Sequence, residues 1–596
     1  MKNENRVFVK EKALNGFSGA WLIPATERRS GVLLTLCEQG FEKCEFATTL
    51  ATEIKVKVFA VAALCGETPN LNAVISAYNY LIENGYSGKN ITLCGSGLLA
   101  DLCLSVVAAL NEQGAQPPCG IVAFAPSAQG LAELKKHKKL ALTLGAPKLN
   151  RQDIKTVLKL KNFLNIKLGR ENKTQWLKLD NAGKMYPATR SEEWSNLFRV
   201  SATLTEEIDK EIMQSALNVT ARRFPSIAVR LRKGLFWYYL EQLSHPPKIL
   251  QEKSYPLTRM SKRETRRCAI RVIVYKNRVA LEVFHTITDG NGALVFLKSL
   301  LAEYLEQKHG LEIPAEKGIL ARFQNPSGAE LEDSFQKNAG SVTAKRKERH
   351  AWQMHGTPET AGFLNLTCFN LSVAETIQKA HEYNVSLTEF LAAVMMFALH
   401  NLQAEKQPNL FRRKPIKVRV PANLRRLYPS STLRNFVMFT IPEILPELGD
   451  YTFAEICKIV HHKLGTDITP KQMSMKIATN IKSEKLMAAR IMPLFVKNFI
   501  IKTAFNSVGE RQACFTVSNL GAINLPSQIK HYFTRFDFIL GAQSKAPHNC
   551  GIVSFGDNLY INLIRNICEP DLEMHIYKVL KELGLKVKVE SNQSER

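Results

Sequence analysis

The sequence predicts two architectures in one chain of 596 residues: a parallel α/β sheet near the N-terminus, followed by an α/β and α+β region with mixed sheets. The first prediction comes from residues 30–126, where short apolar runs alternate with helical patterns, as in sheets whose strands are joined by crossover helices. The second comes from residues 176–590, where helices alternate with strands such as 268–275 and 278–285 that are only two residues apart. Such a short connection joins antiparallel strands, so mixed sheets are expected there.

Composition places the chain among well-packed globular proteins. Hydrophobic residues make up 45% of it, and its length suits about three to four domain-sized units. The 12 cysteines are scattered singly, without a Cys-x-x-Cys pair, which favours reduced and buried thiols and predicts no metal site. Residues 1–6 lead into no apolar targeting segment, so we expect a cytoplasmic protein.

An excess of basic residues favours an anionic partner. Lys and Arg total 80 against 54 for Asp and Glu, a formal charge of +26. Coenzyme A, an acidic acyl carrier protein, a peripheral anionic membrane surface and nucleic acid all fit that charge. The basic clusters lack interleaved aromatic residues for base stacking, which argues against nucleic acid, and each alone is typical of a solvated surface. They are Lys135-Lys-His-Lys-Lys139, Lys262-Arg-Glu-Thr-Arg-Arg267 and Lys345-Arg-Lys-Glu-Arg-His350.

The N-terminal region predicts crossover units in a fixed order. Strands are expected at 31–37, 56–64, 91–94 and 120–125, and helices near 44–53, 70–84 and 98–113. Between the third strand and the third helix lies the glycine-rich turn Cys94-Gly-Ser-Gly-Leu98, at the place where α/β-hydrolases carry their nucleophile elbow. With Tyr78-Asn-Tyr-Leu-Ile-Glu-Asn-Gly85 and Lys89-Asn-Ile-Thr-Leu-Cys-Gly95, it makes residues 1–147 resemble the N-terminal half of the α/β-hydrolase fold, especially that of lipases and esterases.

The residues of hydrolase chemistry are missing from this resemblance. Gly97 stands at the position of the nucleophile, and Ser96 stands one residue early. The expected oxyanion stretch is Cys37-Glu-Gln-Gly-Phe41, from which most glycines are gone, and 127–170 offers no obvious source of the acid and the histidine. We therefore expect a degenerate, truncated domain followed by a basic helical linker over 148–175. An esterase that acts through Ser96 is kept as an alternative.

The stretch His285-Thr-Ile-Thr-Asp-Gly290 sets an imidazole and a carboxylate four residues apart. It follows the apolar strand 278–284 and precedes a helical pattern over 293–304, so it is predicted to be a strand-to-helix turn. A histidine there can titrate near neutrality and act as a general base, whereas Asp289 is placed to anchor the turn. The alternative is an ordinary surface histidine followed by a helix N-cap aspartate.

Three further motifs follow this turn along the chain. They are Val420-Pro-Ala-Asn-Leu-Arg-Arg426, Thr432-Leu-Arg-Asn-Phe436 and Val517-Ser-Asn-Leu-Gly521. In this order and at these distances from the His285 turn, they resemble the coenzyme A-dependent acyltransferase superfamily, which includes chloramphenicol acetyltransferase and the condensation domains of non-ribosomal peptide synthetases. The resemblance covers about 176–590 and is greatest to bacterial alcohol acetyltransferases and wax-ester-synthase-like proteins.

The resemblance implies two chloramphenicol-acetyltransferase-like half-domains, at 176–355 and 356–596, with a tunnel between them and His285 at its midpoint. The implied activity is an O-acyltransferase in which His285 acts as general base. No cofactor would be tightly bound. The cosubstrate would be acyl-CoA, or an acyl carrier with its phosphopantetheine arm, and the acceptor would be an alcohol-type small molecule or lipid.

The family pattern also implies roles for further residues. Asp289 would be structural and pair with an arginine, and Gly290 would leave room for substrate. The candidate arginines, which the sequence does not rank, are Arg199, Arg425 and Arg434. The candidates to stabilise an oxyanion or orient the substrate are Ser518, Asn519 and Asn435. An ordinary turn at Ser518-Asn519 and a packing role for Asn435 stay open as alternatives.

The chain departs from the family pattern at Phe284, where many relatives carry the first of two histidines; the second, here His285, does the chemistry in the family. A non-catalytic scaffold that binds acyl carriers or lipid, with both parts inactive, is a further alternative. The aromatic run Gly234-Leu-Phe-Trp-Tyr-Tyr-Leu240 is expected in the core, although a pocket wall is also compatible with it. Residues 312–352, with their prolines and basic cluster, are expected to link the two halves.

Overall fold

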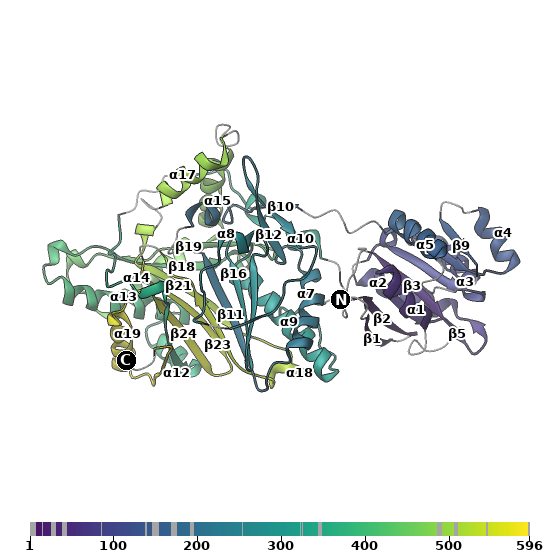
Figure 1. Cartoon of the computed structure of the whole chain (residues 1–596). Helices are drawn as coiled ribbons and strands as arrows, with labels where there is room; N and C mark the ends of the chain where they lie inside the picture. Colours follow the sequence, from purple (N-terminus) through teal and green to yellow (C-terminus); the bar gives the residue numbers. More distant parts are fainter. Residues whose placement is uncertain are drawn as a thin grey trace. The chain divides into compact units, whose positions relative to one another are not determined.

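The chain folds into two compact units. The first unit comprises Met1–Thr174 with Arg322–Asn325, and the second comprises Gln175–Ala321 with Pro326–Arg596 (Figure 1). The computed structural model describes the chain except residues 1–6, 15, 25–30, 39–44, 85, 137–139, 146–153, 169–175, 191–195, 253, 322–323, 325, 344–348, 486–491, 506–509, 544–545 and 594–596.

The first unit contains the predicted parallel sheet, extended by an antiparallel hairpin. Its strand order is β1-β2-β4-β3-β7-β8-β9, and the strands from β4 to β9 are parallel to one another. The sequence did not indicate the β1–β2 hairpin, which pairs antiparallel with β4. The strands are β1 (Val7–Leu14), β2 (Phe17–Pro24), β3 (Val32–Cys37), β4 (Lys57–Ala62), β7 (Ile91–Ser96), β8 (Gly120–Phe124) and β9 (Ala141–Leu144), with β5 (Leu64–Cys65) and β6 (Thr68–Pro69) as a separate short pair.

Helices cover this sheet, and one of them corrects a prediction. They are α1 (Glu45–Thr49), α2 (Leu71–Glu83), α3 (Leu98–Glu112), α4 (Ala128–Lys136) and α5 (Ile154–Lys167). The segment 148–175 was expected to be a linker, but Leu160 and Leu164 of α5 are fully buried in a cluster with Leu33 and Val58 of the sheet. Burial of that leucine stripe makes α5 a core helix of the first unit. The ends of the segment, at 148–153 and 169–175, lie outside the described residues.

The second unit contains two larger mixed sheets. The first has the order β14-β15-β16-β11-β22, and β15 and β16 form the predicted antiparallel pair. Its last strand, β22, belongs by sequence to the C-terminal half and pairs with β11, so the two halves share this sheet. The strands are β11 (Leu197–Leu204), β14 (Leu250–Gln251), β15 (Ile270–Tyr275), β16 (Arg278–Phe284) and β22 (Phe533–Leu540).

The second large sheet has the order β19-β18-β21-β23-β24-β17-β25, with β20 paired to β18. Parallel pairing of β18 with β21 and of β21 with β23 gives it the predicted mixed character. The strands are β17 (Asn365–Ser372), β18 (Ile416–Asn423), β19 (Val437–Thr440), β20 (Glu443–Ile444), β21 (Phe515–Ala522), β23 (His548–Phe555), β24 (Asn558–Arg565) and β25 (Lys588–Ser591).

A small sheet of order β10-β13-β12 completes the strands of the second unit and corrects another prediction. The aromatic run at 234–240 was expected in the core. It forms instead the turn and most of the second strand of the β12–β13 hairpin, and residues 235–237 at its tip are exposed. The strands are β10 (Trp176–Lys178), β12 (Val229–Lys233) and β13 (Tyr238–Gln242).

Helices flank both large sheets. They are α6 (Met185–Thr189), α7 (Lys210–Arg223), α8 (Lys262–Thr265), α9 (Gly290–His309), α10 (Gly328–Leu331), α11 (Ser334–Lys337), α12 (Val373–Glu382), α13 (Leu387–Lys406), α14 (Phe453–Asp467), α15 (Pro470–Lys485), α17 (Leu494–Ala504), α18 (Ser527–Lys530) and α19 (Asp571–Glu582). The segment at 312–352, expected to be a linker, carries α10 and α11. Its basic cluster at 345–350 lies largely outside the described residues.

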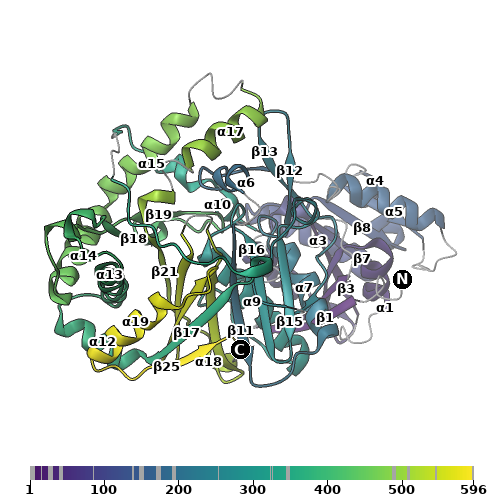
Figure 2. The ribbon, with the colours of Figure 1, turned by 60° about the vertical axis from the view of Figure 1, so that its left-hand side comes forward.

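Among the described helices, α13 is long and apolar enough to cross a membrane. In the structure it is mostly buried in the hydrophobic core of the C-terminal half, beside α14 and α19 (Figure 2). Its start is fixed by a capping box in which the Ser386 hydroxyl accepts from the Glu389 N–H while the Glu389 carboxylate accepts from the Ser386 N–H. The apolar surface of α13 is therefore buried against the core of the C-terminal half.

Candidate active site

The His285 turn joins β16 to α9, as the sequence predicts. The His285 N–H donates to the carbonyl of Asn196 at 2.9 Å, which fixes the start of the turn against the neighbouring chain segment. Asp289 is the N-cap of α9, and its Oδ1 accepts from the Gly292 N–H at 3.1 Å. This cap satisfies one of the backbone donors that a helix leaves unpaired at its first turn.

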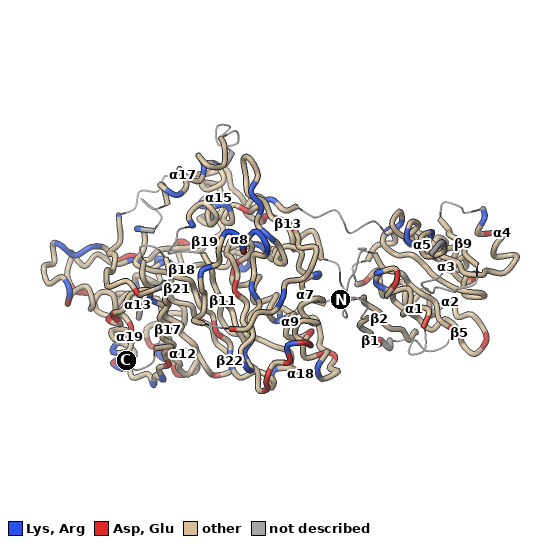
Figure 3. Tube along the Cα trace, in the orientation of Figure 1, with Lys and Arg blue, Asp and Glu red and all other residues tan. Residues whose placement is uncertain are grey.

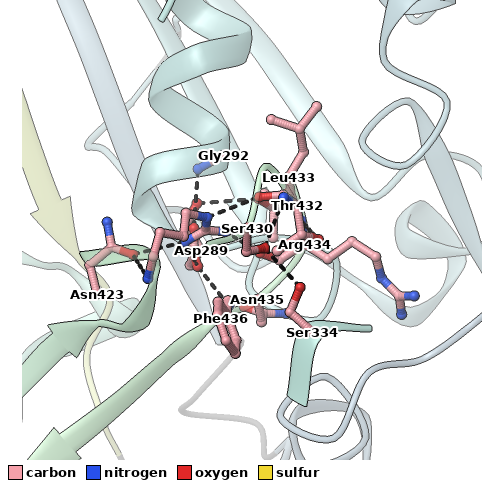
Figure 4. A network of polar contacts seen from close by, with 12 residues as sticks. Asp289, Gly292, Ser334, Asn423, Ser430, Thr432, Leu433, Arg434, Asn435 and Phe436 are labelled. Atoms are coloured by element: carbon pink, nitrogen blue, oxygen red, sulfur yellow. Dashed lines mark hydrogen bonds and ion pairs between the residues drawn. The ribbon is translucent and has the colours of Figure 1, made fainter. Parts of the chain in front are cut away.

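The Asp289 carboxylate also ties the turn to the C-terminal half. Its Oδ2 accepts from Arg425 Nη1 and from the Phe436 N–H, each at 2.8 Å (Figure 4). Arg425 in turn donates to the carbonyls of Thr432 at 2.9 Å and Arg434 at 2.6 Å. The carboxylate is 1% exposed, so this is a buried and fully hydrogen-bonded ion pair. Of the three candidate arginines, Arg425 is the partner of Asp289.

The other two candidate arginines have different partners. Arg199 pairs with Glu252 at 2.5 Å and with Glu282 at 3.3 Å, within the β14–β22 sheet. The Arg434 guanidinium lies with Nε 3.7 Å from Asp180 Oδ2, and its Nη1 donates to the carbonyl of Leu331. Arg199 therefore stabilises the sheet, whereas Arg434 contributes to the site through Asp180.

Asn435 determines how the His285 ring is protonated. His285 Nδ1 lies 3.2 Å from Asn435 Oδ1, while Asn435 Nδ2 donates to Asp180 Oδ2 and to the Thr286 carbonyl, each at 3.3 Å. A carboxylate and a carbonyl only accept, so the amide nitrogen must face them and Oδ1 must face the imidazole. Oδ1 then accepts the Nδ1–H of a neutral ring. The lone pair is left on Nε2, to which no described residue hydrogen-bonds.

Aromatic rings form walls around His285. Tyr186 stacks on it with centroids 4.6 Å apart and planes 19° apart, and Phe198 meets it edge-on at 4.9 Å. Burial lowers the pKa of His285 below its usual value, while the charge of Asp289 and the bond to Asn435 act in the opposite direction. Burial therefore favours the neutral imidazole. The residue as a whole is half-buried.

Sequence reasoning missed Asp180 and Tyr186. Asp180 is buried, and burial raises its pKa to about 6 against the opposing charge of Arg434. Its Oδ1 accepts from the Gly183 N–H at 2.6 Å, and a Cβ at Gly183 would lie 2.6 Å from the Thr286 carbonyl oxygen. The segment thus packs directly on the histidine turn. An Asp followed three residues later by Gly signals a turn, but nothing local indicates this contact.

The remaining candidates make no described hydrogen bond to the imidazole. Asn519 donates to Thr388 Oγ1 of α13 at 3.0 Å and accepts from the Gly521 N–H at 2.7 Å, so its amide is bonded elsewhere. Ser518 is half-buried and lies opposite Gly551 in the ladder with β23.

Gly290 was expected to leave room for substrate. A Cβ at this position would lie 2.6 Å from Leu520 Cδ2, so the glycine makes room for Leu520 instead. The VSNLG motif of β21 therefore lies against the turn through its leucine. Within the described contacts, Asn435 is the candidate of its group that hydrogen-bonds His285.

The corresponding turn of the first unit carries no functional side chain. Gly97, between β7 and α3, has φ 58° and ψ −128°, and its N–H donates to the Phe124 carbonyl at 2.9 Å. A positive φ of this kind suits glycine and would be strained for a residue with a side chain; that Gly97 stands at a nucleophile position stays a prediction from the resemblance. Ser96 is the last residue of β7. Most of the expected oxyanion stretch, at 39–41, lies outside the described residues.

Within the described part of the chain, no group of three His, Cys, Asp or Glu side chains is arranged to hold a metal ion. The groups that converge on the His285 turn are instead one imidazole, two carboxylates, two guanidiniums and one amide. The described hydrogen bonds of these groups run mainly to one another and to the backbone. Nε2 of the imidazole makes no described hydrogen bond. The arrangement is suited to proton transfer at that atom.

No family model matches the chain, and no curated protein matches its sequence. Its structure is similar to polyketide synthase associated protein 5 from Mycobacterium tuberculosis, with 13% identity, a TM-score of 0.43, and coverage of 68% of this chain and 96% of that one. TRI3 trichothecene 15-O-acetyltransferase from Fusarium sporotrichioides has 10% identity and a TM-score of 0.44, covering 68% and 93%. TRI101 from F. graminearum, complexed with coenzyme A and deoxynivalenol, has 9% identity and a TM-score of 0.47, covering 69% and 99%.

Proposed function

We propose that this chain is an O-acyltransferase that moves an acyl group from an acyl thioester to the hydroxyl of an alcohol-type acceptor. The observation that carries the proposal is the hydrogen-bonded chain from His285 through Asn435 to Asp180. It holds the imidazole in the tautomer whose Nε2 lone pair is available. A neutral, positioned imidazole with an unbonded nitrogen is what general-base catalysis at neutral pH requires.

The reaction needs no acyl-enzyme. Nε2 of His285 takes the proton from the acceptor hydroxyl as its oxygen attacks the thioester carbonyl. The tetrahedral intermediate then expels the thiolate, and the Nε2–H returns the proton to it, so that an ester and a free thiol leave. While the ring is protonated, the amide oxygen of Asn435 and the carboxylate of Asp180 stabilise its charge. Holding both reactants beside one imidazole supplies the proximity term of the rate enhancement.

The contributions of the two halves support a shared site. His285 comes from the N-terminal half, whereas Asn435 and the Asp289 partner Arg425 come from the C-terminal half. The surplus of basic residues suits an anionic donor, either acyl-CoA or an acyl carrier with its phosphopantetheine arm. The aromatic walls at Tyr186 and Phe198 suit an apolar acceptor.

Two other activities are less well supported. A non-catalytic scaffold would not need Asn435 to orient His285, nor the buried pair of Asp289 with Arg425. An esterase acting in the first unit would need a nucleophile where Gly97 stands. Acyl transfer accounts for the bonded chain of His285, Asn435 and Asp180 and for the pair of Asp289 with Arg425 that holds the turn, so it is the function we adopt.

The test is thiol release from a panel of acyl-CoA donors with alcohols and diacylglycerol as acceptors. We expect release by the native chain and a loss of about 10³-fold in His285→Ala, because general-base catalysis contributes roughly 10²–10⁴-fold. His381→Ala is the matched control, because His381 is an exposed residue of α12. Release by His285→Ala at the native rate, or no release with any pair of substrates, would refute the proposal.

A further inference from the structure

The second unit exposes a group of large apolar side chains on two adjacent elements. This apolar ridge consists of Leu235, Phe236 and Trp237 at the tip of the β12–β13 hairpin and Phe495, Phe499 and Ile500 on α17. Both views place α17 beside the end of the hairpin (Figure 1, Figure 2). Leu235, Phe495 and Phe499 are 74%, 71% and 72% exposed. Contiguous exposed apolar surface of this kind marks an interaction site more often than an ordinary protein surface.

Hydrogen bonds hold the two elements together as one surface. The Leu494 N–H donates to the Leu235 carbonyl at 3.0 Å, and Lys497 Nζ donates to the Phe236 carbonyl at 2.9 Å. Asn498 Nδ2 donates to the Tyr238 hydroxyl at 3.0 Å. The exposed apolar side chains are therefore presented by bonded backbone rather than by a loose loop.

Three positions of α17, Phe495, Lys497 and Phe499, reverse the placement that is usual in a surface helix, whereas Leu494 is buried and Lys502 is exposed in the usual way. Lys497, which is 6% exposed, points inward, where its Nζ lies 3.4 Å from the centroid of the Trp237 ring. Phe495 and Phe499 point outward. Surface helices usually bury aromatic side chains and expose lysines. This reversed placement is understandable if the outward face has an apolar partner.

Basic residues surround the ridge, and this charge identifies the partner. The segments 232–238 and 494–504 contain no Asp or Glu, and Lys233 and Lys502 are exposed. Figure 3 accordingly shows blue but no red on α17. Lys184 extends over the Trp237 ring at 5.5 Å. A second copy of this surface would bring like charges together, and residues 1–174 also carry more Lys and Arg than Asp and Glu. Neither is charge-complementary to the ridge. An anionic bilayer is complementary to both its charge and its apolar side chains.

We propose that the apolar ridge docks the second unit onto anionic phospholipid bilayers. Leu235 and the phenylalanines of α17 would enter the boundary between headgroups and acyl chains, with Trp237 and Tyr238 at headgroup level and the lysines on the lipid phosphates. The ridge is adjacent to the site described above, because α17 packs against α6. Met185 of α6 is exposed, and its neighbour Tyr186 stacks on His285.

This adjacency lets activity report on the docking, an arm of the test that rests on the proposed function. An alcohol presented in the bilayer would be held beside α6, whose Tyr186 stacks on His285. The membrane docking itself does not depend on acyl transfer, so the two can fail separately.

Vesicle flotation of the full chain tests the docking. We expect the native chain to float with phosphatidylcholine vesicles that contain about one third phosphatidylglycerol, and much less with phosphatidylcholine alone or at high salt. The variant Leu235→Ser/Phe495→Ser/Phe499→Ser should lose binding by roughly tenfold or more. Phe411→Ser is the matched control, because Phe411 is 92% exposed and next to arginines but lies outside the ridge. It should bind like the native chain.

Three outcomes would overturn the proposal. They are a native chain that does not float with anionic vesicles, a triple variant that floats like the native chain, and a triple variant that changes only the mass of the particle in light scattering, which would make the ridge a self-association surface. Thiol release separates the proposals. With a water-soluble alcohol the triple variant should match the native chain, whereas with diacylglycerol in anionic vesicles it should be roughly tenfold slower. Flotation without thiol release from any donor would support docking and refute the acyltransferase.

Discussion

The turn from β7 to α3 in the first unit and the turn from β16 to α9 in the second unit both lead a buried strand into a long helix, but they differ in what surrounds them. At the first turn Gly97 has a positive φ of 58°, and a Cβ there would meet nothing within 4 Å. At the second turn His285 is bonded to Asn435 and packs against two aromatic rings, and the Asp289 carboxylate accepts from three groups.

The difference shows that the shape of such a turn is kept by steric needs that are independent of chemistry. A Cβ at Gly95 would lie 2.3 Å from the Leu99 carbonyl oxygen. Any larger residue would clash there, so the backbone shape of the first turn requires glycine at this position. The second turn gains its chemical character from residues far away in sequence. Catalytic activity should therefore depend on the hydrogen bonds and packing around a turn rather than on the backbone shape of the turn. Each prediction below tests that statement.

The largest effect is expected at Asp289. Asp289→Ala leaves the half-buried Arg425 without its carboxylate partner and the buried Phe436 N–H without an acceptor, so it should lower the free energy of unfolding of the second unit by about 3 kcal/mol. Asp209→Ala is the matched control, because Asp209 caps α7 by accepting from Glu211 and Ile212 and is exposed. It should lose about 1 kcal/mol. Urea unfolding of both variants measures the difference. Equal losses would reduce Asp289 to an ordinary cap.

The second effect is expected at Asn435. Asn435→Ala removes the acceptor that holds Nδ1–H, and kcat should fall by about 10²-fold with little change in KM. The bond to Asn435 raises the pKa of His285, so its loss should also move the acid limb of the pH profile to lower pH. Asn423→Ala, which removes an acceptor for Arg425 but none for His285, is the control that should leave the acid limb in place. An unshifted limb in Asn435→Ala would make Asn435 a packing residue.

The third effect is expected in the slope of the acid limb of the pH profile, which reports how many protons inactivate the native chain. Burial lowers the pKa of His285 below about 6.5, so the base is lost only as the pH falls below that value. The pKa of Asp180 is raised to about 6, and its protonation weakens the hold on Asn435 in the same range. The slope of log kcat/KM against pH should therefore approach about 2 on the acid side in the native chain and about 1 in Asp180→Asn.

Asp467→Asn is the control for this slope. Its carboxylate accepts from the Thr440 hydroxyl and from Lys476, and it contributes to the pKa shift of neither His285 nor Asp180. A reduced slope in Asp467→Asn, or an unchanged one in Asp180→Asn, would contradict the role of Asp180.

The fold was predictable where its signals are local. The β7 and α3 segments carry apolar runs and a glycine turn within about 20 residues, and their bounds were placed almost correctly. The pairing of β22 with β11 joins residues more than 300 positions apart, and no local pattern encodes such a partner. The prediction that the run at 234–240 lies in the core was wrong for another reason. Aromatic content indicates an apolar partner, but it does not distinguish the protein core from the surface of another partner.

The site was predictable only in part, for the same reason. The motif identified His285 and Asp289, because both stand in one turn. It could not rank Arg199, Arg425 and Arg434, because the choice depends on which guanidinium the fold brings to the carboxylate. Asp180 and Tyr186 belong to no motif, and their contacts with Asn435 and His285 arise from tertiary packing alone.

The smallest effect on activity is expected at Gly97. Gly97→Ser places a hydroxyl at the nucleophile position, where the open space accepts a Cβ but the strained backbone should cost roughly 1–3 kcal/mol of stability. Hydrolysis of p-nitrophenyl esters should stay at the native level, because a serine needs a base bonded to it. The sequence of residues 1–174 contains one histidine, His137, which lies outside the described residues. A gain of hydrolysis in Gly97→Ser that Gly97→Ser/His137→Ala abolishes would show that the first unit has kept its base and lost only its nucleophile, and the contrast between the two turns would then come down to a single side chain.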